Sequence, residues 1–261
     1  MPEFLSLLPA SSRKNTLITA SVISHGHGAM VCRLVSQLLE CPEVSKIIVT
    51  LNIPEDISLP ENTRINTIRN NSPLGFAANN NQAFNRGSGD FFCVLNPDIV
   101  LYGNPFGQLI RVMAESGADI SAPCVTSPQG KVEDSVRRFP TFIGLLAKVL
   151  RLSTGQIHFD ATAEPFYPDW VAGMFMFFHR ESYARLGGFD EGFFLYYEDV
   201  DICVRAWNLG MKIVVCPSVS VVHDARRESH RNLRYLRWHL TSMARYFWKH
   251  TGRLPQKNRC S

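Results

Sequence analysis

The sequence places a carboxylate, Asp98, in the motif Asn96-Pro97-Asp98, directly after a hydrophobic run at residues 91–95. If that run is a strand of a parallel sheet, the motif lies at the carboxyl edge, where such sheets bind ligands. Hard divalent ions such as Mg²⁺ are commonly held by one or two carboxylates together with phosphate oxygens and water. The motif therefore predicts a metal and diphosphate site. A turn in which Asn96 and Asp98 cap backbone groups is the alternative.

A second group of carboxylates, Glu198, Asp199 and Asp201, falls on the start of a segment with helical spacing of apolar residues. The helix dipole favours a charged carboxylate at that end. Asp199 is therefore the better candidate for a general base that takes a proton from a hydroxyl group, and N-capping is the simpler role for both Glu198 and Asp199. Asp201 precedes Arg205 by four residues, which predicts an ion pair on the helix surface.

Asparagines are concentrated at the start of a predicted helix, residues 74–86. Asparagine is a poor residue for a helix interior, so Asn79, Asn80 and Asn81 are expected to have another function. Their amides can bind a nucleobase, a ribose or a sugar, and Gly75 allows a close backbone approach.

Histidine side chains supply further candidates. His223 follows an apolar run at residues 219–222, which leaves it at the end of a predicted strand as a structural residue or a metal ligand. His25 and His27 lie in a glycine-flanked loop, and their spacing leaves contact with a ligand or with solvent open.

The elements that must position these residues alternate along the first half of the chain. Strands are predicted at residues 16–23, 46–51, 64–69 and 90–95, and amphipathic helices at residues 30–40 and 74–86. This βαβ succession predicts an α/β fold with a mostly parallel, Rossmann-like sheet flanked by helices. Ser24, Asn52 and Asn96 then meet at its carboxyl edge.

The second half has a different pattern. A helix is predicted at residues 106–116, a strand at 118–125, one buried strand within 170–178, and a helix that starts near residue 198 and ends before Gly210. The apolar run at residues 141–152 is followed by a polar loop at 153–169.

Composition indicates one domain with a short tail, since 45% of the 261 residues are hydrophobic. Seven cysteines without a Cys-x-x-Cys pair indicate reduced thiols, and residues 1–8 lack the basic start of a signal peptide. No run approaches the length of a membrane helix. We expect a cytoplasmic protein.

Residues 223–261 carry ten Lys and Arg against two acidic residues, although the whole chain is only +4. Aromatic and basic residues alternate between 232 and 250, as in helices that lie on an anionic membrane surface. We therefore expect the protein to lie peripherally on the inner face of the plasma membrane. The alternative is that the aromatic residues of this helix pack on the core. Nucleic acid is not an expected partner, because no base-reading element accompanies the charge.

Taken together, these stretches resemble the family 2 glycosyltransferases of GT-A fold, especially bacterial rhamnosyltransferase-like members that build surface polysaccharides. The resemblance covers about residues 18–250 and is carried by residues 71–82, 94–98 and 187–205. It implies an inverting enzyme that moves a sugar, such as the deoxyhexose rhamnose, from a nucleoside-diphosphate sugar to a saccharide or lipid-linked acceptor.

The resemblance also implies individual roles. Asp98 and His223 are implied as ligands of a divalent metal, Mg or Mn, and Asp199 of the Glu198-Asp199 pair as the catalytic base. The implied donor-binding residues are Ser24, Asn52, Gly75, Asn80, Asn81 and Asn96, and the acceptor-binding residues are Trp170, Gly173 and Arg205.

The implied organisation is a catalytic domain over residues 1–222, with a donor half at about 16–125 and a smaller acceptor half at about 126–222, followed by a basic, aromatic helical tail at 223–261. Leu51 stands where the family usually has an aspartate, and Ser24-His25 replaces a Tyr-Asn-like pair. A nucleotidyltransferase is the main alternative, but the loop after Ser24 lacks the basic residue typical of that class. An inactive sugar- or lipid-binding module is the second alternative.

Overall fold

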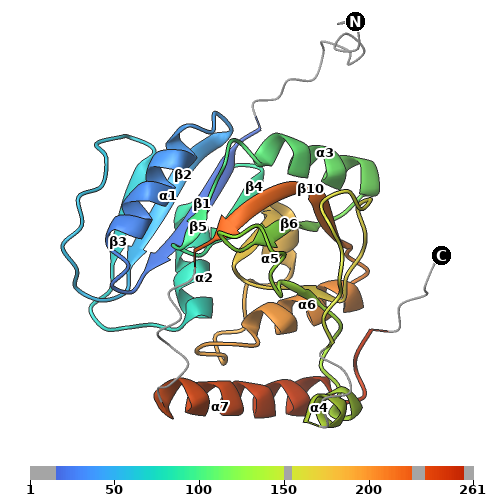
Figure 1. Cartoon of the computed structure of the whole chain (residues 1–261). Helices are drawn as coiled ribbons and strands as arrows, with labels where there is room; N and C mark the ends of the chain where they lie inside the picture. Colours follow the sequence, from blue (N-terminus) through green and yellow to red (C-terminus); the bar gives the residue numbers. More distant parts are fainter. Residues whose placement is uncertain (1–15, 150–154, 225–232, 256–261) are drawn as a thin grey trace, which may run out of the picture.

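The computed structural model describes residues 16–149, 155–224 and 233–255. Its centre is a sheet with the strand order β3-β2-β1-β4-β9-β6-β10-β5 (Figure 1). The strands are β1 (Ile18–Ser24), β2 (Val44–Leu51), β3 (Ile65–Arg69), β4 (Phe91–Leu95), β5 (Ile99–Val100), β6 (Ile120–Thr126), β9 (Phe175–His179) and β10 (Ile213–His223). The first four strands are parallel to one another and β6 is parallel to β10, whereas β9 and β5 are antiparallel to their neighbours. The predicted mostly parallel sheet is confirmed.

Helices cover both faces of this sheet (Figure 1). One apolar cluster packs α1 (Ala29–Leu39) and α3 (Phe106–Ser116) on one face. A second cluster packs α2 (Phe76–Arg86), α5 (Arg180–Arg185) and α6 (Glu198–Asn208) on the other. The sheet is therefore buried on both sides, which explains why its strands read as continuous apolar runs.

Four further elements complete the described chain. The two strands β7 (Val136–Arg137) and β8 (Trp170–Val171) form a small antiparallel sheet. The helices α4 (Phe142–Val149) and α7 (Leu233–His250) lie together at the lower edge of Figure 1. None of the described helices is long and apolar enough to span a membrane.

The predicted elements of the first half agree with the structure to within two residues at each end. The single strand predicted at residues 170–178 is wrong, because the chain divides it into β8 and β9 with a turn at Gly173 and Met174. The backbone N–H of Gly173 donates to the carboxylate of Asp199 instead of to a neighbouring strand. An apolar run alone could not reveal this break.

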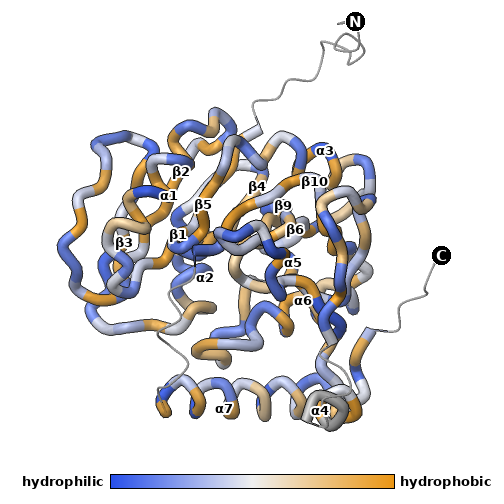
Figure 2. The backbone as a smooth tube through the Cα atoms, in the orientation of Figure 1, coloured by the Kyte–Doolittle hydropathy of each residue, from blue (hydrophilic) through white to orange (hydrophobic). Residues whose placement is uncertain are grey.

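Helix α7 has one packed face and one exposed face. Tyr246 is buried with its ring centroid 5.3 Å from that of Tyr197, and Ser242 Oγ donates to the carbonyl of Leu195 over 2.8 Å. The packing expected as the alternative for the tail is thus present. On the other face Leu233 and Trp248 remain 82% and 83% exposed, and hydrophilic and hydrophobic segments alternate along the helix in Figure 2. Residues 225–232 and 256–261 of the predicted tail lie outside the described residues.

The contact between α6 and α7 is centred on Asp201, which has no exposed surface. Its Oδ2 accepts from Arg205 Nε over 2.8 Å, and its Oδ1 lies 2.7 Å from His250 Nε2 and 2.6 Å from Lys249 Nζ. The predicted ion pair of Asp201 and Arg205 is confirmed, but its predicted surface location is wrong, because α7 covers it. Burial opposes ionisation of Asp201, yet these partners outweigh it and lower the pKa of the carboxyl.

We predict that Asp201→Ala lowers the free energy of unfolding by about 3–5 kcal/mol, because it removes a fully buried carboxylate from the partly buried Arg205 and Lys249. Urea denaturation measures this change. Arg33→Ala is the matched control: it removes an ion pair with Asp224 whose side chains are 41% and 47% exposed, and we expect a loss of about 0–1 kcal/mol. Equal effects of the two substitutions would contradict the assignment.

Candidate active site

Polar residues follow the carboxyl ends of β1, β2 and β4, as the parallel arrangement requires. Ser24 ends β1, and its carbonyl accepts the backbone N–H of Asn52, directly after β2, over 2.8 Å. Asn96 follows β4 and donates its backbone N–H to the carbonyl of Met174 over 2.9 Å. The turn before β9 therefore also lies at this carboxyl edge of the sheet.

Asp98 and His223 are brought together by the last pair of strands. The antiparallel pairing of β5 with β10 sets His223 opposite Ile99, so that His223 Nε2 lies 3.2 Å from Asp98 Oδ2. The other oxygen, Asp98 Oδ1, is buried and has no hydrogen-bond partner among the described residues. A buried carboxylate oxygen without a partner is costly, and a divalent cation would satisfy it.

Glu133 lies behind His223. Its Oε2 is 2.6 Å from His223 Nδ1, the position of a carboxylate that orients a metal-binding histidine. Burial opposes protonation of His223, but the hydrogen bonds and charges of Asp98 and Glu133 outweigh it and raise its pKa to about 9. Sequence reasoning missed Glu133, because it stands in a loop with no motif around it.

These residues would supply only part of a metal's coordination. Within residues 16–149, 155–224 and 233–255, no group of three or more His, Cys, Asp and Glu side chains is arranged as a complete metal centre. Asp98 and His223 fit as two ligands of a hard cation whose remaining ligands are diphosphate oxygens and water.

Asp199 is held by two backbone N–H groups. Its Oδ2 accepts from Gly173 over 3.0 Å and its Oδ1 accepts from Val200 over 2.8 Å. Burial raises the pKa of Asp199, while these N–H groups and the positive charge of Arg137 act in the opposite direction. Both carboxylate oxygens are thus oriented, and the charged form has defined donors.

Glu198 differs from its neighbour. It is 5% exposed, and its Oε2 has no hydrogen-bond partner among the described residues. Burial, together with the charge of Asp199, raises its pKa well above the ordinary value. Of the two adjacent carboxyls, Glu198 is thus the one whose neutral form its surroundings favour more, because Asp199 has backbone donors on both oxygens.

The start of α6 is conformationally strained. Tyr196 and Tyr197 have φ angles of 70° and 68°, a left-handed conformation that non-glycine residues rarely adopt. Tyr197 occupies the N-cap position, and no side chain there forms a capping hydrogen bond. Neither Glu198 nor Asp199 occupies the N-cap position, although Asp199 Oδ1 accepts the first-turn N–H of Val200.

Gly173 is needed for its small size. A Cβ at this position would lie 3.2 Å from the ring of Phe76 and 3.7 Å from Asp199 Cβ. The carbonyl of the next residue, Met174, accepts the backbone N–H of Asn96. Two consecutive residues thus make the connection: Gly173 is hydrogen-bonded to Asp199 at the start of α6, and Met174 is hydrogen-bonded to the segment that contains Asp98.

The asparagine segment binds the chain itself. Asn52 Oδ1 accepts from Leu74 N over 2.8 Å and from Asn70 Nδ2 over 2.9 Å, and Asn70 Nδ2 also donates to Asn79 Oδ1 over 2.7 Å. Asn80 is fully buried and accepts from Ser21 Oγ over 2.8 Å. These contacts fix the loop before α2.

Asn81 and Gly75 attach this loop to the segment before α6. Asn81 Oδ1 accepts from the backbone N–H of Phe189 and from Tyr183 Oη over 2.9 and 2.8 Å. A Cβ at Gly75 would lie 2.5 Å from the carbonyl oxygen of Phe194. The close approach expected at Gly75 is therefore an approach to the backbone of Phe194 in the same chain. Donor contact by Gly75, Asn80 and Asn81 stays a prediction.

Two of the three expected acceptor residues have structural partners. Trp170 Nε1 donates to the carbonyl of Arg138 over 3.0 Å. The guanidinium of Arg205 donates to Asp201 and to the carbonyls of Leu186 and Gly188. Arg205 thus holds the turn before α6, and its acceptor contact stays a prediction.

Comparison with solved structures shows the fold. The chain superposes on GalNAc-T7 with UDP, GalNAc and Mn²⁺ with a TM-score of 0.67 at 17% identity, covering 83% of this chain and 45% of that one. It superposes on the mannosyltransferase PcManGT from Pyrobaculum calidifontis, in complex with GDP-Man and Mn²⁺, with a TM-score of 0.60 at 14% identity, covering 90% and 64%. The fold is GT-A.

Comparison of sequences adds relatives. The chain is 28% identical over 240 residues to rhamnosyltransferase WbbL of Escherichia coli, covering 86% of this chain and 90% of WbbL. It is 26% identical over 164 residues to N-acetylglucosaminyl-diphospho-decaprenol L-rhamnosyltransferase of Mycobacterium tuberculosis, of which it spans 50%. The family model described as glycosyltransferase like family 2 matches residues 44–241. The chain therefore belongs to the glycosyltransferase-like family 2 and is a glycosyltransferase.

Proposed function

We propose that this enzyme transfers rhamnose from a nucleoside-diphosphate donor to a lipid-linked saccharide, with inversion and with a divalent metal. The single observation that carries the mechanism is the carboxylate of Asp199, which accepts the N–H of Gly173 next to the segment that holds Asp98. The choice of sugar and acceptor is supported by the two relatives, which are named for rhamnosyl transfer.

In this mechanism Asp199 accepts the proton of the acceptor hydroxyl as that oxygen attacks the anomeric carbon. Attack on the side opposite the leaving diphosphate inverts the anomeric centre without a covalent enzyme intermediate. Asp98 and His223 would hold a divalent ion, and that ion would offset the negative charge of the leaving nucleoside diphosphate. Glu133 keeps His223 Nε2 directed toward Asp98.

The protonation states support this division of labour. Asp199 remains an acceptor because Gly173 and Val200 donate to it, and protonated Glu198 adds no second negative charge to the acceptor side. A raised pKa also moves Asp199 closer to the working pH, where proton transfer is most effective.

We also propose that the exposed face of α7 lies on an anionic membrane. The helix from Leu233 to His250 contains Arg234, Arg237, Arg245 and Lys249 and no acidic residue, and of these Arg245 and Lys249 pair with Asp190 on the packed side. Leu236 and Leu240 on its outer face are 54% and 49% exposed. Basic and apolar side chains together are what binds a helix to such a surface.

We predict that a nucleoside diphosphate stabilises the protein only when Mn²⁺ or Mg²⁺ is present, with dTDP more effective than UDP or GDP. A ligand present at about 100 times its Kd stabilises the folded state by about 2.7 kcal/mol. In a chain of this size each kcal/mol of stabilisation raises Tm by about 2–4 °C. A thermal-shift assay measures it. Asp98→Asn should remove the metal-dependent part, and no response to any nucleotide would refute the proposal.

We predict that the protein floats with vesicles that contain anionic phospholipid and that Leu236→Glu, on the exposed face of α7, reduces the bound fraction. A carboxylate there opposes both apolar insertion and attraction to the surface. Tyr102→Glu, at an exposed position after β5, is the matched control and should float as the wild type does. Recovery of the wild type wholly in the soluble fraction would contradict membrane binding.

A further inference from the structure

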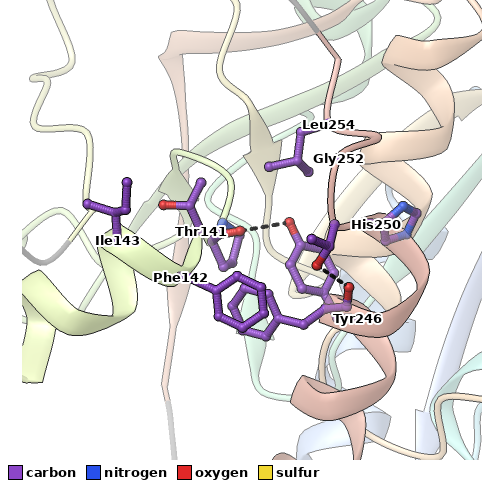
Figure 3. Close-up of a pocket in the computed structure, with 10 residues that line it drawn as sticks. Thr141, Phe142, Ile143, Tyr246, His250, Gly252 and Leu254 are labelled. Atoms are coloured by element: carbon purple, nitrogen blue, oxygen red, sulfur yellow. Dashed lines mark hydrogen bonds between the residues drawn. The ribbon is translucent and has the colours of Figure 1, made fainter.

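An apolar groove lies between α4 and the end of α7 (Figure 3). Its volume is about 270 Å³, close to the lower end of small-molecule pockets, at about 300 Å³. The residues that line it are Pro140, Thr141, Phe142, Ile143, Tyr246, Phe247, His250, Thr251, Gly252 and Leu254. The groove is therefore built by two helices that are far apart in the sequence.

The polar atoms of the groove lining are already engaged. Tyr246 Oη donates to the carbonyl of Pro140 over 3.1 Å, and Thr141 Oγ1 accepts the N–H of Gly144 over 2.9 Å. His250 Nε2 is directed to Asp201. The surface that remains for an occupant is apolar, which favours hydrocarbon over a sugar or a phosphate.

Aromatic and aliphatic side chains at the rim are open to solvent. Phe142 stacks on Phe247 with ring centroids 4.3 Å apart but is still 58% exposed, and Ile143 is 82% exposed (Figure 3). Exposed apolar surface next to an apolar groove marks a site for a hydrophobic partner.

The groove lies close to the catalytic base. Tyr246, which lines it, packs against Tyr197 at 5.3 Å between ring centroids, and Tyr197 precedes Asp199 by two residues. The positive charge of Arg137 acts on both Tyr197 and Asp199. Tyr246 and Tyr197 therefore connect the groove lining to the segment that carries Asp199.

Basic residues connect the base with the groove. Arg137 belongs to β7 and is paired with Asp134, and the exposed Arg138 follows it on the segment that leads to α4. An acceptor with a sugar, a phosphate or diphosphate and a hydrocarbon chain presents its groups in that same order. The arrangement of base, arginines and apolar groove is complementary to it in charge and polarity.

We propose that the α4–α7 groove binds the part of a polyprenyl chain nearest the diphosphate of the lipid-linked acceptor. This assignment rests on the proposed function and adds a site to it. The groove holds a short length of chain, and the remainder enters the membrane beside the exposed face of α7. The exposed Arg138 lies where the acceptor's phosphates pass, and Asp199 lies at its sugar.

The test is photocrosslinking of the full-length protein with farnesyl diphosphate that carries a benzophenone group, followed by peptide mapping. We expect labelling in peptides that contain residues 140–143 and 246–254, and competition by unmodified farnesyl diphosphate. Phe142→Glu and Ile143→Glu place a charge at the apolar rim and should each reduce the labelling about tenfold or more. Tyr102→Glu, also an exposed position, should leave the labelling unchanged.

Labelling outside these peptides, or labelling unchanged by both rim substitutions, would overturn the proposal. Competition by dioleoylphosphatidylglycerol vesicles as strong as that by farnesyl diphosphate would also overturn it, because the groove would then bind membrane acyl chains. The measurement needs no glycosyl transfer, and metal-dependent nucleotide binding is measured separately. Failure of this site is therefore distinguishable from failure of the proposed function.

Discussion

The hydrogen bond from the Gly173 backbone to the Asp199 carboxylate is the contact on which the site depends. Met174, the next residue, accepts the N–H of Asn96, and Asn96 begins the motif that contains Asp98. Two chemical centres from distant parts of the chain are thus held at a fixed separation by one short segment. The break between β8 and β9 exists because Gly173 is used in this way.

A second constraint is the division of charge between Glu198 and Asp199. Two adjacent buried carboxyls do not both ionise readily, and only Asp199 has backbone donors on both oxygens. Tyr196 and Tyr197, directly before the two carboxyls, both have left-handed φ angles. Strain of this kind persists only where the surrounding structure fixes it, and it is concentrated at functional sites.

Much of the fold was predictable because burial on both sides of a parallel sheet leaves a strong signal. Continuous apolar runs and helical periodicity locate β1 to β4 and their helices to within two residues. Asp98 and His223 were recognisable because each stands at the end of an apolar strand. The carboxyl edge of a parallel sheet is where such residues converge.

The remaining features depend on contacts between distant residues, which sequence spacing does not encode. Glu133 meets His223 only because the loop after β6 folds back on β10. Asn80 and Asn81 have amides suited to a ligand, yet they bind Ser21, Phe189 and other parts of the chain. Local chemistry shows what a side chain can bind, and the tertiary fold decides which partner it meets.

In this mechanism Asp199 carries the negative charge and Glu198 carries the proton. The rate of sugar transfer by the variants Asp199→Asn and Glu198→Gln measures this most directly. We predict that Asp199→Asn lowers kcat by about 10²–10⁴-fold, the usual contribution of a general base, while metal-dependent nucleotide binding is retained. Glu198→Gln should change kcat by less than about tenfold, since glutamine resembles a protonated glutamate. A larger loss in Glu198→Gln than in Asp199→Asn would contradict the account.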